Sequence, residues 1–345
     1  MPTSVDLRSD TLTRPTAAMR AAMAAAEVGD DVFGEDPTIR ALEMEAAVRL
    51  GQPAALYLPS GTMANQVAIH VHCRPGDELI CEERSHVYQY EGGSIARLSG
   101  TQVRLLSAED GFPSPDQVVA AIRRDDPHHA RSRLLVLENT HNMAGGRVLT
   151  PERFDALVAA AKSRGLLVHV DGARLANAGV ALDVPMSRLT QGVDSVTLCL
   201  SKGLGAPVGS MLAGSSDFIA AARRVRKAFG GGMRQAGVIA AAGLIALREG
   251  PAALRVDHER ARSLAAGLTG RAGMRPAPTA TNIVMLDFEA PVAAECVAWL
   301  RGREVLALPI HERRVRFVFH RDVPDDAVQR VLAALADFVP NPIRA

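Results

Sequence analysis

Lysine is rare in this chain, and one of its lysines stands where it could do chemistry. Of the 39 lysines and arginines, only Lys162, Lys202 and Lys227 are lysines. Lys162 and Lys227 end helix-like stretches, where a cation favours the helix C-terminus. Lys202 instead lies between an apolar run and a glycine-rich run. A partly desolvated amine can lose its proton and attack a carbonyl, so we interpret Lys202 as a Schiff-base lysine; the alternative is a surface lysine after a strand.

The common partner of a Schiff-base lysine is pyridoxal phosphate, which also needs an acid at its pyridine nitrogen, a phosphate cradle and a stacking partner. Asp171 ends the apolar run 166–170 and could be the acid, or else an N-cap. His86 follows a strand and could stack on the ring, or else be a surface histidine. His169 shares a strand face with Asp171, and we interpret it as a hydrogen-bonded core histidine.

The phosphate cradle is expected at Ser60, Gly61 and Thr62, between a strand and a helix. Glycine lets the backbone approach an anion, the helix N-terminus offers free N–H groups, and Thr62 adds a hydroxyl. A plain helix cap is the alternative. Arg234 follows three glycines and could reach an anion, although that glycine run could equally be a helix cap and linker.

Composition excludes several classes of protein. The net charge is +1 in 345 residues, which argues against a nucleic-acid or membrane-surface protein. The N-terminus lacks a signal peptide pattern, and no stretch has the apolar length of a membrane span. The four cysteines are far apart and form no CxxC pair, which fits reduced thiols in the cytoplasm and argues against structural zinc. We therefore expect no metal site.

Short apolar runs alternate with helix-like stretches and predict an α/β fold. Because these runs are apolar on both faces, they predict a mostly parallel sheet covered by helices on two sides. Ligands bind at the C-terminal ends of such strands, where Asp171 and Lys202 fall. The expected strands are 54–58, 78–81, 102–106, 134–138, 166–170, 195–200 and 210–213, and the expected helices include 115–124 and 151–164.

The pattern divides the chain into three parts. Residues 1–14 are polar and irregular and are expected to wrap the main domain or a partner subunit. Residues 15–250 form the large cofactor-binding domain. Residues 251–345 form a smaller α+β domain, with strands at 282–287 and 315–319 and a last helix at 325–338.

Seven motifs in order resemble those of the low-specificity L-threonine aldolases, and the resemblance runs from about Val5 to the last helix. The stretches that carry it are 7–11 (LRSDT), 30–37 (DDVFGEDP), 60–65 (SGTMAN), 138–142 (ENTHN), 169–174 (HVDGAR), 201–204 (SKGL) and 230–237 (GGGMRQAG).

The resemblance implies a pyridoxal-phosphate enzyme of the aspartate-aminotransferase-like fold (fold type I). It implies cleavage of L-threonine or L-allo-threonine to glycine and acetaldehyde, in a homotetramer built as a dimer of dimers with active sites between subunits. It assigns the cofactor to Lys202, Asp171, His86, Gly61 and Thr62.

The resemblance also implies how the substrate amino acid is held. Arg174 matches a residue that binds the cofactor's phenolic oxygen or the substrate carboxylate. Ser9 and Arg316 match carboxylate-binding positions, and a bidentate guanidinium suits that role. Arg234 is expected from the neighbouring subunit. His128 matches a histidine near the substrate hydroxyl, so the catalytic base could be His86, His128 or a water.

Departures from the family concern the aldehyde side of the substrate. Phe33 replaces a tyrosine, Phe319 replaces a threonine, and His129 stands where an aromatic residue is usual. We expect the missing hydroxyl at Phe33 to favour substrates such as phenylserine.

Three other functions are compatible with parts of this pattern. A β-eliminating lyase, or an aldolase for another β-hydroxy amino acid, would keep Lys202 and Asp171. A catalytically silent protein of the same fold would show no cofactor absorbance. A metal-dependent aldolase is disfavoured, because the spacing of the histidines fits no ligand pattern.

Overall fold

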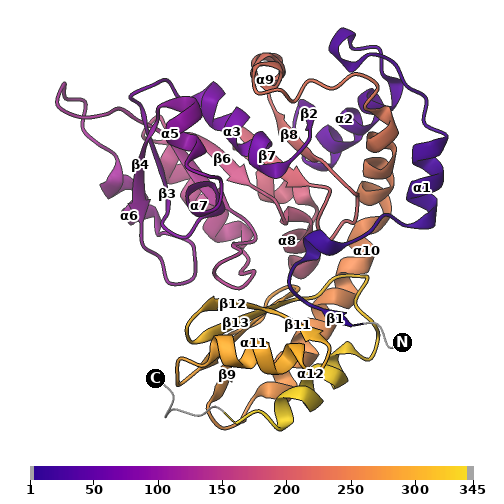
Figure 1. Ribbon diagram of the computed structural model, residues 1–345. Coiled ribbons are helices and arrows are strands. Elements are labelled where there is room, and N and C mark those ends of the chain that lie inside the picture. The colour runs from indigo at the N-terminus through magenta and orange to yellow at the C-terminus, as the bar shows by residue number, and fades with distance from the viewer. Residues whose placement is uncertain (1–3, 340–345) are drawn as a thin grey trace.

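The computed structural model describes residues 4–339 and contains a large part and a small part. In Figure 1 the large part lies above and the small part below, and the long helix α10 (Gly237–Leu268) runs through both. The predicted α/β class, with a mostly parallel sheet and a smaller C-terminal sheet domain, is confirmed.

The large part is built on a seven-stranded sheet in the order β2-β8-β7-β6-β5-β3-β4. Only β8 is antiparallel to its neighbours, β2 and β7; the remaining pairs are parallel. All seven strands lie where the apolar runs predicted them, within about two residues. They are β2 Ala54–Leu58, β3 Glu78–Glu82, β4 Gln102–Leu106, β5 Ser132–Glu138, β6 Leu167–Asp171, β7 Ser195–Cys199 and β8 Ser210–Gly214.

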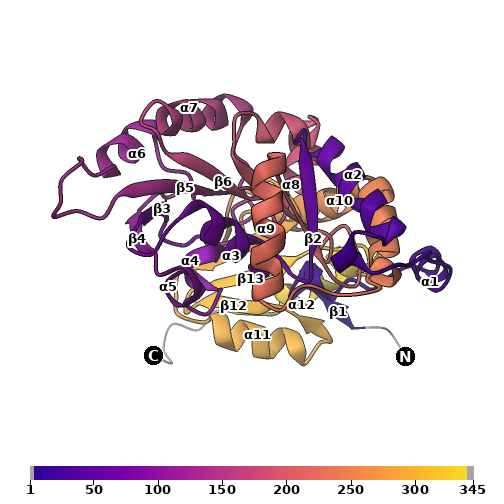
Figure 2. The same ribbon diagram turned by 90° about the horizontal axis from the view of Figure 1, so that it is seen from above.

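Helices cover both faces of this sheet because the strands are apolar on both sides (Figure 2). In β5, Leu135 and Leu137 pack into one core, whereas Leu134 and Val136 pack into another. Helices α6 and α7 lie on one side, and α3, α4 and α5 on the other. The helices of the large part are α1 Ala17–Ala24, α2 Pro37–Arg49, α3 Gly61–His72, α4 His86–Gln89, α5 Ser94–Ser99, α6 Pro115–Ala121, α7 Pro151–Lys162, α8 Leu175–Leu182 and α9 Ser216–Ala228, with short 3-10 helices at Asp10–Leu12, Asp31–Phe33 and Met186–Thr190.

The small part carries a four-stranded antiparallel sheet in the order β12-β13-β10-β9. The two predicted strands correspond to β10 and β13, and the predicted last helix to α12; β9 and β12 were not predicted, being short edge strands. The elements are β9 Met274–Pro276, β10 Ile283–Phe288, α11 Ala293–Arg301, β11 Val305–Leu306, β12 Leu308–His311, β13 Arg314–Val318 and α12 Ala327–Ala336.

The N-terminal segment differs from the irregular arm that was predicted. Strand β1 (Val5–Asp6) pairs in parallel with β11, so the segment adds a strand to the small part. It then crosses to the large part, where the Thr13 hydroxyl donates a hydrogen bond of 2.9 Å to the Lys202 carbonyl. Residues 1–3 of the predicted arm lie outside the described residues.

Helix α10 belongs to both hydrophobic cores. Its residues up to Leu254 pack in the core of the large part, and those from Ala261 pack in the core of the small part. The helix continues through Pro251, although proline removes one helical hydrogen bond. The domain boundary expected after residue 250 therefore falls inside a shared helix, and the division remains a prediction. By length and composition α10 could cross a membrane, as many buried core helices could.

Asp257 on α10 gives a prediction about stability. Its side chain is buried, and neither carboxylate oxygen has a hydrogen-bond partner among the described residues. Burial raises its pKa to about 7, because the charge of Asp10 adds to desolvation and Arg260 offsets this only in part. We expect Asp257→Asn to raise the free energy of unfolding by roughly 1–3 kcal/mol at pH 8.

The difference in the free energy of unfolding between Asp257→Asn and the wild type should shrink as the pH falls from about 7 to about 4. Above pH 7 the wild-type carboxyl must ionise in an apolar site, whereas below the unfolded pKa it is neutral in both states. Urea unfolding at pH 8 and pH 5 measures the difference. Glu249→Gln, at an exposed position of the same helix, is the control. A variant that is less stable than the wild type at both pH values would contradict the prediction.

Candidate functional site

The C-terminal ends of the parallel strands bring four predicted site residues into one region. Asp171 ends β6, Lys202 follows β7, His86 follows β3, and Gly61 opens α3 after β2. Side-chain atoms of His86, Glu91 and Asp171 lie within 4.8 Å of one another. Lys202 is close enough for its charge to act on the pKa of His86. The sheet therefore gathers a lysine, a histidine and a buried carboxylate.

A chain of hydrogen bonds points toward Asp171. Asn65 Nδ2 donates to Asp171 Oδ2 at 2.9 Å, and the Ala173 N–H donates to Oδ1 at 3.1 Å. Behind Asn65, His169 Nε2 lies 3.2 Å from Asn65 Oδ1, and His169 Nδ1 lies 2.8 Å from Ser195 Oγ. Burial lowers the pKa of His169 to about 4, so its ring is neutral near pH 7 and acts as a donor toward Asn65. His169 is thus a hydrogen-bonded core histidine, in agreement with the sequence analysis.

His86 is oriented by a buried glutamate. His86 Nδ1 lies 2.9 Å from Glu91 Oε1, and the Glu91 side chain is fully buried. Burial alone would lower the pKa of His86, but the hydrogen bond to Glu91 and the charge of Asp171 outweigh it and raise this pKa above its usual value. With Nδ1–H held by Glu91, His86 Nε2 is the nitrogen left to accept a proton.

By spacing alone His86, Glu91 and Asp171 could also hold a cation. Glu91, however, already accepts hydrogen bonds from the side-chain amides of Asn65 and Gln66, at 2.9 and 2.6 Å. These amide donors present partial positive charge to the carboxylate, where a metal ion would have to lie. The arrangement fits hydrogen bonding better than metal binding, and the expectation of no metal stays a prediction.

If His86 is the base of a reaction at this site, Glu91→Gln should move the pH profile of that reaction. Without the Glu91 charge the pKa of His86 falls, and a base that must be neutral then works down to a lower pH. We expect the acidic limb of the pH profile of kcat/KM to shift to lower pH. At the pH optimum we expect kcat/KM to fall about tenfold, because the His86 ring is held less firmly. Glu83→Gln on a neighbouring loop is the control. An unchanged limb would show that His86 is not the titrating base.

The start of α3 supports the predicted phosphate cradle. Ser60 caps the helix by accepting a hydrogen bond from the Met63 N–H at 3.2 Å, as in the plain-cap alternative. Among the described residues no hydrogen bond engages the N–H groups of Gly61 and Thr62, so both can donate to an anion. Gly61 is required by packing as well, since a Cβ atom there would lie 2.6 Å from Cys199 Sγ.

Two buried arginines, Arg174 and Arg316, share one acceptor beside this region. Arg174 NH1 and Arg316 NH1 lie 3.4 and 3.0 Å from Asn142 Oδ1. Arg174 makes a two-bond ion pair with Asp10, in which both distances are 2.7 Å. Arg316 donates to the Arg8 carbonyl but has no carboxylate partner, and its Nε is unpaired among the described residues.

The electrostatics of Arg316 favour an anionic ligand. Burial, followed by the positive charge of Arg174, lowers the pKa of Arg316 to about 10. The guanidinium still carries its charge at pH 7, in a place where a second cation repels it. A carboxylate bound there would relieve this repulsion and satisfy the free Nε. Ser9 lies next to Arg8 and caps the helix Asp10–Leu12, which puts it on the same side of the site.

Three predicted site residues lie outside this cluster. The side chain of His128 is 88% exposed, and its Nδ1 lies 2.8 Å from Asp126 Oδ1. The side chain of Arg234 is 53% exposed and forms an ion pair with Asp30. Phe33 is 75% exposed. Among the described residues of this one chain, no hydrogen bond or ion pair links any of the three to Lys202 or Asp171. Within this chain, the described contacts therefore do not join these three residues to the cluster.

Four residues of the site were absent from the predicted set. Asn65 and Asn142 stand inside the stretches 60–65 and 138–142, and Asp10 stands inside 7–11, so the motifs contained them without showing their role. Glu91 lies outside every motif. Its only signal is a carboxylate five residues after His86, which is too common a spacing to identify a partner.

Comparisons with known proteins agree with this arrangement. A family model described as beta-eliminating lyase matches residues 6–291. Low-specificity L-threonine aldolase 1 of Arabidopsis thaliana is 44% identical over 339 residues, covering 96% of this chain and 95% of the relative. The low specificity L-threonine aldolase of Escherichia coli (strain K12) is 45% identical over 332 residues, covering 95% and 97%.

Solved structures support the fold. The threonine aldolase of Leishmania major has a TM-score of 0.82 at 21% identity and covers 96% of this chain and 98% of its own. Serine palmitoyltransferase of Sphingomonas wittichii has a TM-score of 0.77 at 19% identity and covers 96% and 86%. At these identities the likeness shows a shared architecture only.

Proposed function

The chain belongs to the beta-eliminating lyase family and groups with its low-specificity L-threonine aldolases, and from this membership we propose that it cleaves L-threonine and L-allo-threonine to glycine and acetaldehyde. The observation that carries the proposal is the pair Arg174 and Arg316 beside Lys202, His86 and Asp171. This arrangement provides a carboxylate site, an amine, a base and a buried acid in one region.

The residues present fit pyridoxal phosphate. Lys202 would supply the amine that binds the cofactor covalently, the start of α3 would supply N–H groups for its phosphate, and Asp171 would supply a carboxylate for its ring nitrogen. Side-chain atoms of His86 and Asp171 lie within 4.8 Å of each other, so a single ring could contact both residues. When bound, the cofactor supplies an electron-poor ring that accepts the electron pair of the breaking bond.

The residues of the chain account for the rest of the reaction. Arg316 and Arg174 would hold the α-carboxylate and so fix which bond at Cα faces the cofactor. Asn65 and the histidine behind it donate toward Asp171 and hold the carboxylate in one orientation. His86 Nε2 would take the proton of the β-hydroxyl, which lets the bond between Cα and Cβ open to an aldehyde. The same nitrogen would return a proton to Cα and complete glycine.

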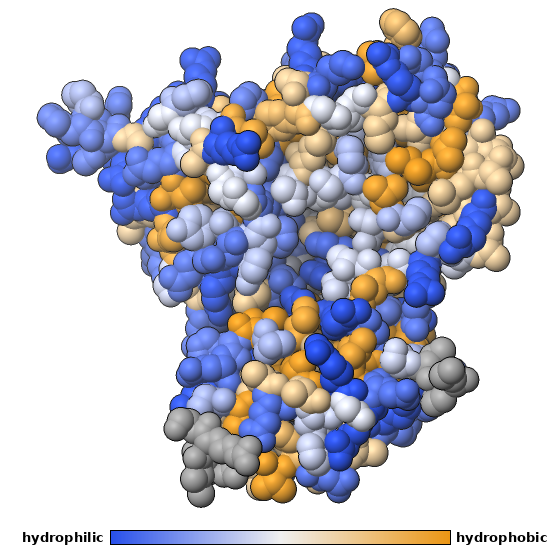
Figure 3. All heavy atoms as spheres, viewed as in Figure 1, coloured by the Kyte–Doolittle hydropathy of each residue, from blue (hydrophilic) through white to orange (hydrophobic). Residues whose placement is uncertain are grey.

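We propose a homotetramer, a dimer of dimers, in which the second subunit completes the site. Exposed apolar side chains support an interface, since Val28, Val32 and Phe33 are 43%, 38% and 75% exposed on one segment. Hydrophobic residues also gather on the right of the face shown in Figure 3. The four cysteines are buried and unpaired, which supports a reducing compartment such as the cytoplasm.

Replacing His128 with phenylalanine tests whether the second subunit supplies the base. If an exposed His128 reaches a neighbouring site, His128→Phe should lower kcat/KM for L-threonine by about 10²-fold, the lower range for a positioned proton-transfer group. Sedimentation of the variant checks that the assembly is intact. Full activity would exclude His128 and leave His86 or a water as the base.

The proposed function is tested by an absorbance spectrum of the purified protein, followed by product analysis with L-threonine. We expect a visible cofactor band and release of acetaldehyde and glycine. Ammonia and a keto acid would instead identify a β-eliminating lyase. Aldehyde release from phenylserine but not from L-threonine would identify an aldolase for another β-hydroxy amino acid. The absence of a band after addition of pyridoxal phosphate would mean that the fold serves another purpose.

A further inference from the structure

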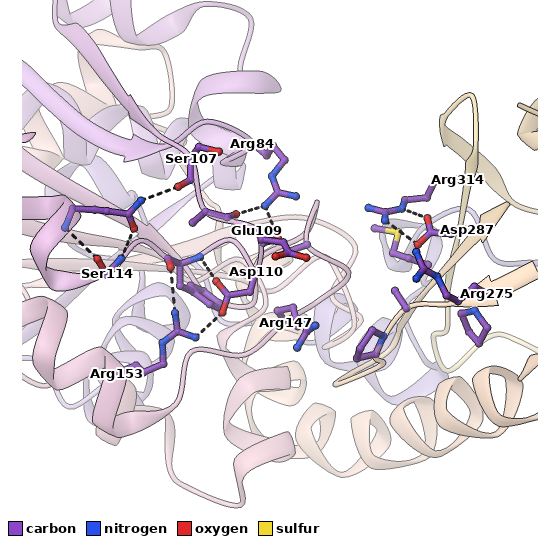
Figure 4. A pocket seen from close by; sticks show the side chains of 18 residues that line it. Arg84, Ser107, Glu109, Asp110, Ser114, Arg147, Arg153, Arg275, Asp287 and Arg314 are labelled. Atoms are coloured by element: carbon purple, nitrogen blue, oxygen red, sulfur yellow. Dashed lines mark hydrogen bonds and ion pairs between the residues drawn. The ribbon is translucent and has the colours of Figure 1, made fainter. Parts of the chain in front are cut away.

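A cleft of about 880 Å³ separates the large part from β9, β10 and β13 of the small part. Figure 4 shows its two walls facing each other, and five arginines line it: Arg84, Arg147, Arg153, Arg275 and Arg314. We call it the arginine cleft. Its volume lies within the usual range for sites that bind small molecules.

The charges of the arginine cleft are only partly neutralised. Three of its arginines form ion pairs: Arg84 with Glu82, Arg153 with Asp110, and Arg314 with Asp287. Within residues 4–339 the side chains of Arg147 and Arg275 form no ion pair or hydrogen bond, although the charge of Arg147 helps to lower the pKa of Asp110.

Arg147 and Arg275 stand on opposite walls, one from each part of the molecule (Figure 4). Glu109 is the one lining carboxylate without an ion-pair partner in the described chain, so the unpaired groups leave an excess of positive charge. A guanidinium binds oxyanions through two parallel N–H groups, whereas a cation would be repelled here.

The chain segment 141–147 lies between the arginine cleft and the proposed carboxylate site at Arg174 and Arg316. His141 and Arg147 form an isolated β-bridge, in which the His141 N–H donates to the Arg147 carbonyl at 3.0 Å. The next residue, Asn142, accepts hydrogen bonds from Arg174 and Arg316. The same segment contacts the small part, since the Thr281 hydroxyl donates to the Gly146 carbonyl at 2.9 Å.

We propose that the arginine cleft binds a small multivalent oxyanion, such as a phosphate ester or a tricarboxylate. The anion bridges Arg147 of the large part and Arg275 of the small part, and it thereby sets how the two parts are held around the reaction site. Asn142 comes directly after His141, the bridge partner of Arg147, and it contacts Arg174 and Arg316. Occupancy of the cleft therefore changes the apparent KM for an amino acid more than it changes kcat.

Calorimetric titration of the holoenzyme with pyrophosphate and with citrate tests the proposal. We expect saturable binding of at least one of them. Binding of pyrophosphate would indicate a phosphate site, and binding of citrate would indicate a carboxylate site. The variant carrying Arg147→Gln and Arg275→Gln should bind it about tenfold more weakly or worse. Arg20→Gln, at an exposed position of α1, is the matched control and should bind as the wild type does.

Two results would overturn the proposal. One is the absence of saturable binding of either anion at millimolar concentration. The other is equal affinity in the wild type and the double variant, which would place the anion elsewhere, for example on Arg316. Arg275 is exposed, so Arg275→Glu alone keeps the test decisive if the double variant fails to fold. Failure of this site would leave the absorbance and product tests of the proposed reaction unaffected.

Discussion

Replacing Lys202 with alanine is expected to lower kcat by about 10⁴-fold and to remove the covalent attachment of the cofactor. A positioned proton-transfer group typically raises the rate by about 10²- to 10⁴-fold. We expect the upper end of this range for Lys202, because its amine also forms the bond to the cofactor. No other lysine can substitute, since Lys162 is paired with Asp194 and Lys227 is an exposed residue of α9. Single-turnover kinetics and the visible absorbance of the purified variant measure both effects.

Lys227→Ala is the matched control for this variant and should keep the wild-type rate and spectrum. A primary amine added to Lys202→Ala should restore part of the activity, because it can supply the missing nitrogen. If Lys202→Ala kept both the band and the rate, the role assigned to Lys202 would be wrong, and the surface-lysine interpretation would stand.

Replacing Asp10 with alanine is expected to lower the free energy of unfolding by about 3–5 kcal/mol. Asp10 is fully buried, and its loss would leave Arg174 as a buried cation without a counterion. Arg174 would also lose the two hydrogen bonds that hold its guanidinium in place, so weaker binding of the substrate is expected as well. Urea unfolding at pH 7 measures the loss of stability.

The chain offers a matched control on the same segment. Asp6 pairs with Arg8 near the surface, where ion pairs contribute at most about 1 kcal/mol, so Asp6→Ala should have a small effect. Equal losses for Asp10→Ala and Asp6→Ala would contradict the prediction.

The pH dependence of the Asp10 contribution has a definite sign. Burial alone would raise the pKa of Asp10, but the charge and hydrogen bonds of Arg174 lower it to about 2. A carboxyl whose folded pKa lies below its unfolded value stabilises the fold above about pH 4, and this contribution is lost as the pH falls toward 2. The difference between the wild type and Asp10→Asn should shrink over that window.

Local patterns in the sequence predicted the strands and the residues at their ends. Short apolar runs predicted all seven strands of the main sheet, because every strand except the edge strand β4 is largely buried on both faces. Parallel strands end at one edge, so Lys202, Asp171, His86 and Gly61 could be placed in one region from their positions after the strands. The motifs added the family, which the comparisons confirm.

Tertiary structure alone decided the contacts that join distant segments. Asp10 and Arg174 are 164 residues apart, and Asn142 and Arg316 are 174 apart, so no local period links them. The N-terminal segment reads as irregular because its two-residue strand exists only by pairing with β11. Likewise, the sequence of β8 resembles those of the parallel strands. Only its antiparallel pairing with β2 and β7 shows that it runs in the opposite direction. The type of a side chain determines which interactions it can make, whereas its actual partner depends on how the whole chain packs.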